Sequence, residues 1–78
     1  MLYQIVFIDR YHKERIDGLS VEGDGAAWRH CWAHVTSPEF INHPLKFTFC
    51  RLEDVDIQGK AIRVLTPPEG FPLQLRQA

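Results

Sequence analysis

The chain has 78 residues, 45% of them hydrophobic, and nine Lys or Arg against ten Asp or Glu give a net charge of −1. This length provides one small domain, and the apolar content excludes a disordered chain. The balanced charge creates no overall field for nucleic acid or an anionic membrane, so we do not expect nucleic acid as the favoured partner.

The first eight residues are apolar, but no basic segment precedes them and charged residues follow at once. This pattern does not fit a signal peptide, and the longest apolar run is far below the ~20 residues of a membrane helix. We therefore expect a cytoplasmic protein with no membrane partner. Thiols are reduced in that compartment, and we expect Cys31 and Cys50 to face each other in the core.

Two strands are predicted in the N-terminal part of the chain. Residues 2–9 are apolar on both faces, which fits a strand that is covered on both sides. A polar connection leads to a second strand over residues 14–22, where the apolar positions change phase at Gly18. One extra residue would explain that change, so we expect a β-bulge at Gly18.

The C-terminal part predicts two more strands and a tail. Residues 45–50 alternate apolar and polar side chains, and residues 61–65 follow a tight turn as the closing strand. Prolines forbid regular structure after residue 66. We therefore expect a single domain over residues 1–66 and a Pro-rich C-terminal tail over 67–78. That tail is either loose or laid across the domain by Phe71 and Leu73.

The segment over residues 26–35 fits either a helix or a strand. A helix places four apolar residues on one side: Trp28, Cys31, Trp32 and Val35. A strand places another four residues on one face: Trp28, His30, Trp32 and His34. Periodicity favours the helix, whereas the aromatic content and the short length between turn residues favour the strand.

Three stretches of the chain resemble the WYL domain of bacterial regulators. That family typically carries an R-I-x-P-L segment, a W-Y-L-x-A-Y-C-H strand and an R-T-F-R-L-D-R-I strand. The matching stretches here are R-I-D-G-L at 15–19, W-R-H-C-W-A-H at 28–34 and T-F-C-R-L-E-D-V at 48–55. Cys50 is an inserted residue in this comparison, and Asp54 stands at the family's second arginine. The resemblance implies a barrel that senses a small anionic or nucleotide-like ligand in a regulatory system.

With this resemblance, the predicted fold is mainly β: a small five-stranded SH3/Sm-like barrel in which residues 26–35 are extended. The alternative is an α+β protein of ββαββ order with a helix over residues 26–36. Compact proteins of that size and order are common among interaction and inhibitor proteins of phages and mobile elements.

The sequence contains no complete catalytic or metal-binding pattern. On a helix, His30 and His34 could coordinate one metal ion together with His43 or Cys50, but the glutamate of an HExxH motif is absent. Nothing in the spacing joins a cysteine to a histidine and an orienting carboxylate. We expect no metal, no cofactor and no enzymatic activity.

Aromatic rings with interleaved arginines predict a binding surface, because they can stack on bases or on side chains of a partner. The candidate binding residues are Arg15, Trp28, Arg29, Trp32 and Arg51. The expected function is a small non-enzymatic binding or regulatory module, whose partner is another protein or a small nucleotide-like ligand. The alternative is a protein–protein interaction or inhibitor protein of the phage or mobile-element type.

Overall fold

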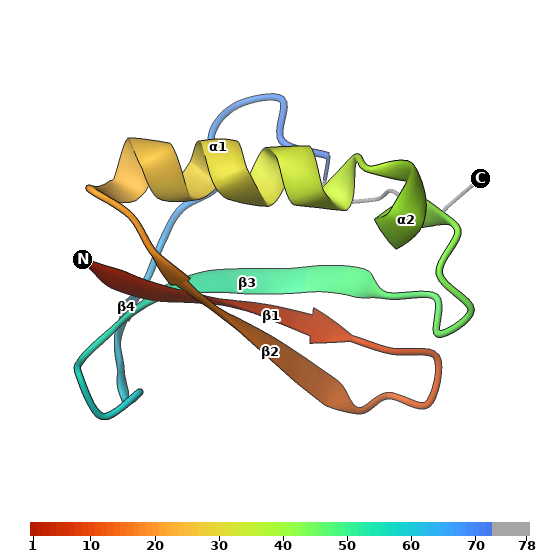
Figure 1. Cartoon of the computed structure of the whole chain (residues 1–78), viewed down its shortest axis with the longest axis horizontal. Coiled ribbons are helices and arrows are strands. Elements are labelled where there is room, and N and C mark those ends of the chain that lie inside the picture. Colours follow the sequence, from red (N-terminus) through yellow and green to blue (C-terminus); the bar gives the residue numbers. More distant parts are fainter. Residues whose placement is uncertain (73–78) are drawn as a thin grey trace.

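The computed structural model describes residues 1–72 and contains a four-stranded antiparallel sheet with two helices over one face (Figure 1). In chain order the elements are β1 (Leu2–Ile8), β2 (Glu14–Ser20), α1 (Asp24–Val35), α2 (Pro38–Ile41), β3 (Thr48–Val55) and β4 (Ala61–Val64). The strands lie in the order β2-β1-β3-β4, so the sheet is open among the described residues. The α+β alternative is therefore correct, and the five-stranded SH3/Sm-like barrel is wrong.

Residues 26–35 are helical because only a helix buries their apolar side chains together. The buried residues of α1 are Ala27, Trp28, Cys31 and Val35, which recur at the spacing of one helix face. On a strand, Cys31 and Val35 would point to the side opposite Trp28. The strand prediction is wrong for this reason, and the helix predicted over residues 26–36 corresponds to α1.

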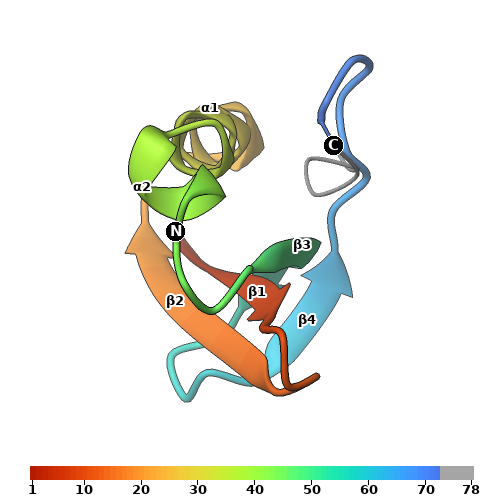
Figure 2. The ribbon, with the colours of Figure 1, turned by 90° about the vertical axis from the view of Figure 1, so that its right-hand side faces the viewer.

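The core lies between the helices and the sheet face that they cover, which we call the inner face. Its buried members are Tyr3, Ile5, Phe7, Ala27, Trp28, Cys31, Val35, Phe40, Phe49, Leu52, Leu65 and Phe71. The edge strand β2 contributes only the partly buried Leu19. Figure 2 shows the twist of the sheet: β2 and β4 slant in opposite directions, and β4 lies to one side of the helices.

A β-bulge lies in β3, and the prediction of a bulge at Gly18 is wrong. The β1–β2 register runs unbroken from Leu2↔Ser20 to Ile8↔Glu14. In β3 the register shifts between Val6↔Arg51 and Phe7↔Phe49, which leaves Cys50 without a partner residue. The change of phase in β2 needs no bulge. Leu19 lies on the inner face, whereas Ile16 lies on the opposite face of the sheet, which we call the outer face. The helices do not cover that face, and Ile16 is 55% exposed there.

The bulge separates the two cysteines. It keeps both Phe49 and Leu52 on the inner face, and it leaves Cys50 exposed. Cys31 is buried in the core as predicted, and neither thiol is in a disulfide. The prediction that the two cysteines face each other in the core is therefore wrong.

The segment after β4 packs on the core through Phe71. Its ring centroid lies 4.9 Å from that of Trp28, 5.4 Å from Trp32 and 5.0 Å from Phe49. Leu73, the other predicted anchor, lies outside the described residues, and the division of the chain at residue 66 stays a prediction. Neither helix of residues 1–72 has the length and apolar character to cross a membrane.

Candidate binding site

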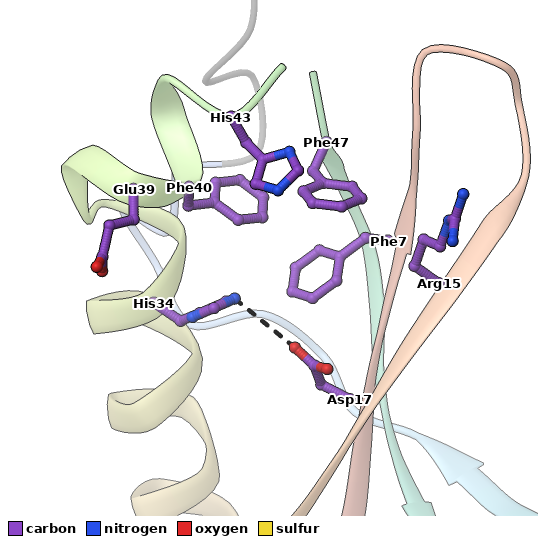
Figure 3. A pocket seen from close by; sticks show the side chains of 8 residues that line it. All are labelled: Phe7, Arg15, Asp17, His34, Glu39, Phe40, His43 and Phe47. Carbon is purple, nitrogen blue, oxygen red and sulfur yellow. Dashed lines mark ion pairs between the residues drawn. The ribbon is translucent and has the colours of Figure 1, made fainter. Parts of the chain in front are cut away.

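A pocket of about 220 Å³ opens between β2 and the end of α1 with α2, and we call it the β2 pocket (Figure 3). It exists because the sheet twists beneath straight helices. In Figure 1 the first residues of β2 lie farther from the helices than the last residues of that strand. Side chains on the inner face of this half of β2 therefore line a wedge that the helices do not fill.

Three phenylalanines form the apolar floor of the pocket. Phe7 comes from the inner face of β1, Phe40 from α2 and Phe47 from the segment before β3. The ring centroids lie 5.1 Å apart for Phe7 and Phe40, and 5.9 Å apart for Phe40 and Phe47. The turn between the helices positions Phe40, because the Ser37 hydroxyl accepts its N–H and donates to the His34 carbonyl.

The rim of the pocket is polar, and strand alternation places two of its groups. Arg15 and Asp17 are two residues apart on β2, so both side chains point to the inner face. Across the opening, Nε2 of His34 lies 3.8 Å from Oδ2 of Asp17, and the two form an ion pair only when His34 is protonated. Figure 3 shows Asp17 pointing toward His34, with Arg15 at the other side of the rings.

The charge of Arg15 is balanced by Asp9 at the end of β1. Nε and Nη2 of Arg15 lie 2.9 and 2.8 Å from Oδ2 of Asp9, whose side chain is fully buried. Burial by itself raises the pKa of Asp9, but N–H groups of Lys13 and Tyr11 and the Arg15 guanidinium together lower it below its usual value. Asp9 thus stays ionised and fixes Arg15.

His43 and Glu39 complete the rim. Nδ1 of His43 accepts the N–H of Leu45 at 3.1 Å, and the imidazole lies 4.6 Å from the Phe47 ring between centroids. Because Nδ1 accepts this hydrogen bond, Nε2 is the ring nitrogen that is left to donate one. Glu39 contributes a carboxylate from α2 that is directed away from the phenylalanine rings (Figure 3). Among residues 1–72, Glu39 has no ion-pair partner and Asp17 has only His34, so these two carboxylates give the pocket its excess negative charge.

The structure does not bring the five predicted binding residues together. Arg15 lies at the β2 pocket, whereas Trp28 is 8% exposed and belongs to the core. Arg29 is exposed on α1, and Trp32 is half-buried against Phe71. Arg51 lies beside Glu53 and Glu14, at 2.7 and 3.5 Å, on the outer face of the sheet.

Most residues of the pocket carried no sequence signal of a site. The sequence pointed to His34 and His43 only as metal ligands. Among residues 1–72, no group of three His, Cys, Asp or Glu side chains is arranged to hold a metal ion. One signal was present in β2. Arg15 and Asp17 lie on the same face of β2 as Leu19, which packs against the core. The alternation of the strand therefore predicts apolar residues at positions 15 and 17, where the sequence has charged ones.

Comparisons of the chain with protein-family models, with curated proteins and with solved structures gave no match. The resemblance to WYL domains accordingly stays a prediction, and its middle stretch lies on α1 rather than on a strand.

Proposed function

We propose that this protein is a small non-catalytic module that binds a partner protein by taking one of its side chains into the β2 pocket. The observation that carries the proposal is an aromatic-floored pocket with a charged rim. Its volume of about 220 Å³ is below the ~300–1,000 Å³ of sites that enclose drug-sized ligands. A pocket of this size matches a single anchoring side chain, the usual centre of a protein interface.

The chemistry of the rim supports a protein partner over a nucleotide-like ligand. Phosphate groups are held by cations and backbone N–H groups that are free to receive them. The one arginine of the pocket is already paired with Asp9, and the carboxylates of Asp17 and Glu39 would repel an anion.

The residues that line the pocket support binding rather than catalysis. They include no hydroxyl, thiol or amine nucleophile, and of the four imidazole and carboxylate groups Asp17 and His34 are held as a pair. The buried thiol of Cys31 has its pKa raised to about 12 by burial, which opposes nucleophilic use. An inhibitor is one form that such a module takes, and the activity of the partner in the complex distinguishes it from an adaptor.

Selection from a random peptide library tests the proposal. Peptides selected on the wild-type protein are measured against Asp17→Phe, which fills the pocket from β2, and against Ile57→Phe, which puts the same ring on the exposed connection between β3 and β4. We expect Asp17→Phe to weaken binding about tenfold or more and Ile57→Phe to leave it unchanged. Circular dichroism checks that both variants are folded.

Equal binding by Asp17→Phe and the wild type would show that the pocket is not the site. Titration with adenosine monophosphate gives the second readout. A saturable response that Asp17→Phe removes would replace the protein partner by a nucleotide-like ligand.

A further inference from the structure

No strand within residues 1–72 pairs with the outer edge of β2, and this free edge presents backbone groups that can pair with another strand. Two bonds join Met1 and Val21, with N···O distances of 2.8 and 3.1 Å, and Asp9 N–H donates to the carbonyl of Lys13 at 3.0 Å. Bonded and non-bonded pairs alternate in an antiparallel ladder. Residues 15, 17 and 19 therefore bond to β1, and residues 14, 16, 18 and 20 turn their N–H and C=O groups outward.

The other edge of the sheet is less suited to pairing. β4 has four residues, its register shifts between Asp54 and Val55, and Pro67 and Pro68 follow soon after it. Short, bulged and proline-bounded strands are how proteins block an edge. β2 has seven residues in unbroken register, and all of them except Leu19 are exposed. An added strand would therefore pair with β2.

The charges beside this edge select a basic side chain. In an added strand, a residue opposite Asp17 would have its Cβ about 5 Å from that of Asp17 and would point to the inner face. Asp9 balances Arg15, whereas within the described part of the chain the carboxylate of Asp17 has only His34 as a partner, and only when His34 is protonated. The stem of an arginine or lysine would cover the phenylalanine floor while its cation reaches Asp17.

We propose that the partner contributes an extended segment that pairs with the free edge of β2 as a fifth strand and places an Arg or Lys side chain in the β2 pocket. This inference rests on the proposed function and names the chemistry of the partner. Backbone hydrogen bonds along β2 supply affinity, and the pocket supplies specificity for the cationic side chain.

Two variants of one residue test the added strand. Ile16→Pro removes an outward N–H without breaking a bond to β1, whereas Ile16→Ala keeps that N–H and removes the same side chain. The probes are the peptides selected from the random library on the wild-type protein. We expect Ile16→Pro to weaken their binding about tenfold or more and Ile16→Ala to change it less than threefold.

Amide hydrogen exchange in the complex gives a readout that does not depend on the folding of Ile16→Pro. We expect the amides of Ile16, Gly18 and Ser20 to become protected when peptide binds. We also expect Arg or Lys at one inward position of the selected peptides, and about tenfold weaker binding by Asp17→Asn.

The outcomes separate this inference from the proposed function. The fifth strand would be overturned if Asp17→Phe loses peptide binding while Ile16→Pro keeps it, and if no amide of β2 becomes newly protected. That result would leave the pocket as the site. Selected peptides with an acidic or apolar anchor would overturn the basic partner alone. Peptides indifferent to Asp17→Phe would overturn both proposals.

Discussion

The hydroxyl of Tyr3 donates a 2.7 Å hydrogen bond to Oδ1 of Asp24, joining β1 to the first turn of α1. Nη2 of Arg63 lies 2.9 Å from the same oxygen, and Nε of Arg63 lies 3.1 Å from Oδ2 of Asp54. One network therefore connects α1 to β1, β3 and β4 at the start of the helix. The β2 pocket lies at the other end of α1, beside His34.

Removing the Tyr3 hydroxyl tests how much this network contributes. We expect Tyr3→Phe to lower the free energy of unfolding by about 1 kcal/mol, because the Asp24 carboxylate loses a hydrogen bond that is partly buried from solvent. Urea denaturation measures the change. Tyr11→Phe is the matched control, because Tyr11 is 64% exposed and its change should stay within about 0.5 kcal/mol. An equal effect of both substitutions would contradict this role of the network.

The same hydrogen bond predicts how Tyr3 titrates. Burial, followed by the bond to Asp24, raises the pKa of Tyr3 to about 12. Because the folded value exceeds the unfolded value of about 10, this stabilisation is complete below pH 10 and is lost as pH rises toward 12. Ultraviolet difference titration of the wild-type protein against Tyr3→Phe should assign to Tyr3 an ionisation near pH 12. An ionisation of Tyr3 near the ordinary tyrosine value of about 10 would contradict the prediction.

Acid should destabilise the fold through three carboxylates. Hydrogen bonds from Arg63 and then Tyr3 lower the pKa of Asp24, and those from Gln4 and then Arg51 lower that of Glu53. Asp9 also has a lowered pKa. A lowered folded value gives stability that is present above the unfolded pKa of about 4 and is lost as pH falls through the folded value.

Urea midpoints measured from neutral pH downward test this prediction. We expect little change down to about pH 5 and a steady fall below pH 4. Glu53→Gln should flatten that fall, because the variant lacks one of the three groups. A midpoint that rises on acidification, or an unchanged slope in Glu53→Gln, would contradict the assignment.

The two cysteines should differ sharply in reactivity. Cys50 is exposed at the bulge, whereas Cys31 is buried with a pKa of about 12. A chromogenic disulfide reagent should therefore modify one thiol quickly in the folded protein and the second only after unfolding. Cys50→Ser should remove the fast reaction. Rapid modification of both thiols would mean that α1 does not pack as described.

The aromatic ring of Phe71 should hold the segment after β4 on the core. We expect Phe71→Ala to lower the free energy of unfolding by about 3 kcal/mol, because the ring is buried against Trp28 and Trp32. Urea denaturation followed by tryptophan fluorescence measures the loss. Ile57→Ala is the control, since Ile57 is 88% exposed and should change stability little. A loss below about 1 kcal/mol would place Phe71 outside the core.

The positions of β1, β2 and β4 could be predicted from sequence because their signals are local, whereas the strand predicted over residues 45–50 overlaps β3 only at its start. The many β-branched and aromatic residues mark β1, and the turns mark β4. The choice between helix and strand for α1 could not be made from propensity, because tryptophan favours strands while the buried face requires a helix. The three- and four-residue spacing of Trp28, Cys31 and Val35 was the correct signal.

The pocket escaped prediction because it depends on the angle between elements. Phe7, Phe40 and Phe47 come from three separate segments, and each reads in sequence as an ordinary core residue. The twist of the sheet and the Ser37 turn decide where these rings meet. Arg15 was predicted as a binding residue on one surface with Trp28. The fold does not form that surface, because Trp28 is buried in the core.

Residue-resolved chemical-shift mapping of the complex with a selected peptide tests the central claim most directly. The account predicts that the largest changes fall on Asp17, His34 and Phe47 around the β2 pocket, with Arg29 and Arg51 unchanged. Changes centred on the exposed face of α1 around Arg29, or on the outer face around Arg51, would contradict it.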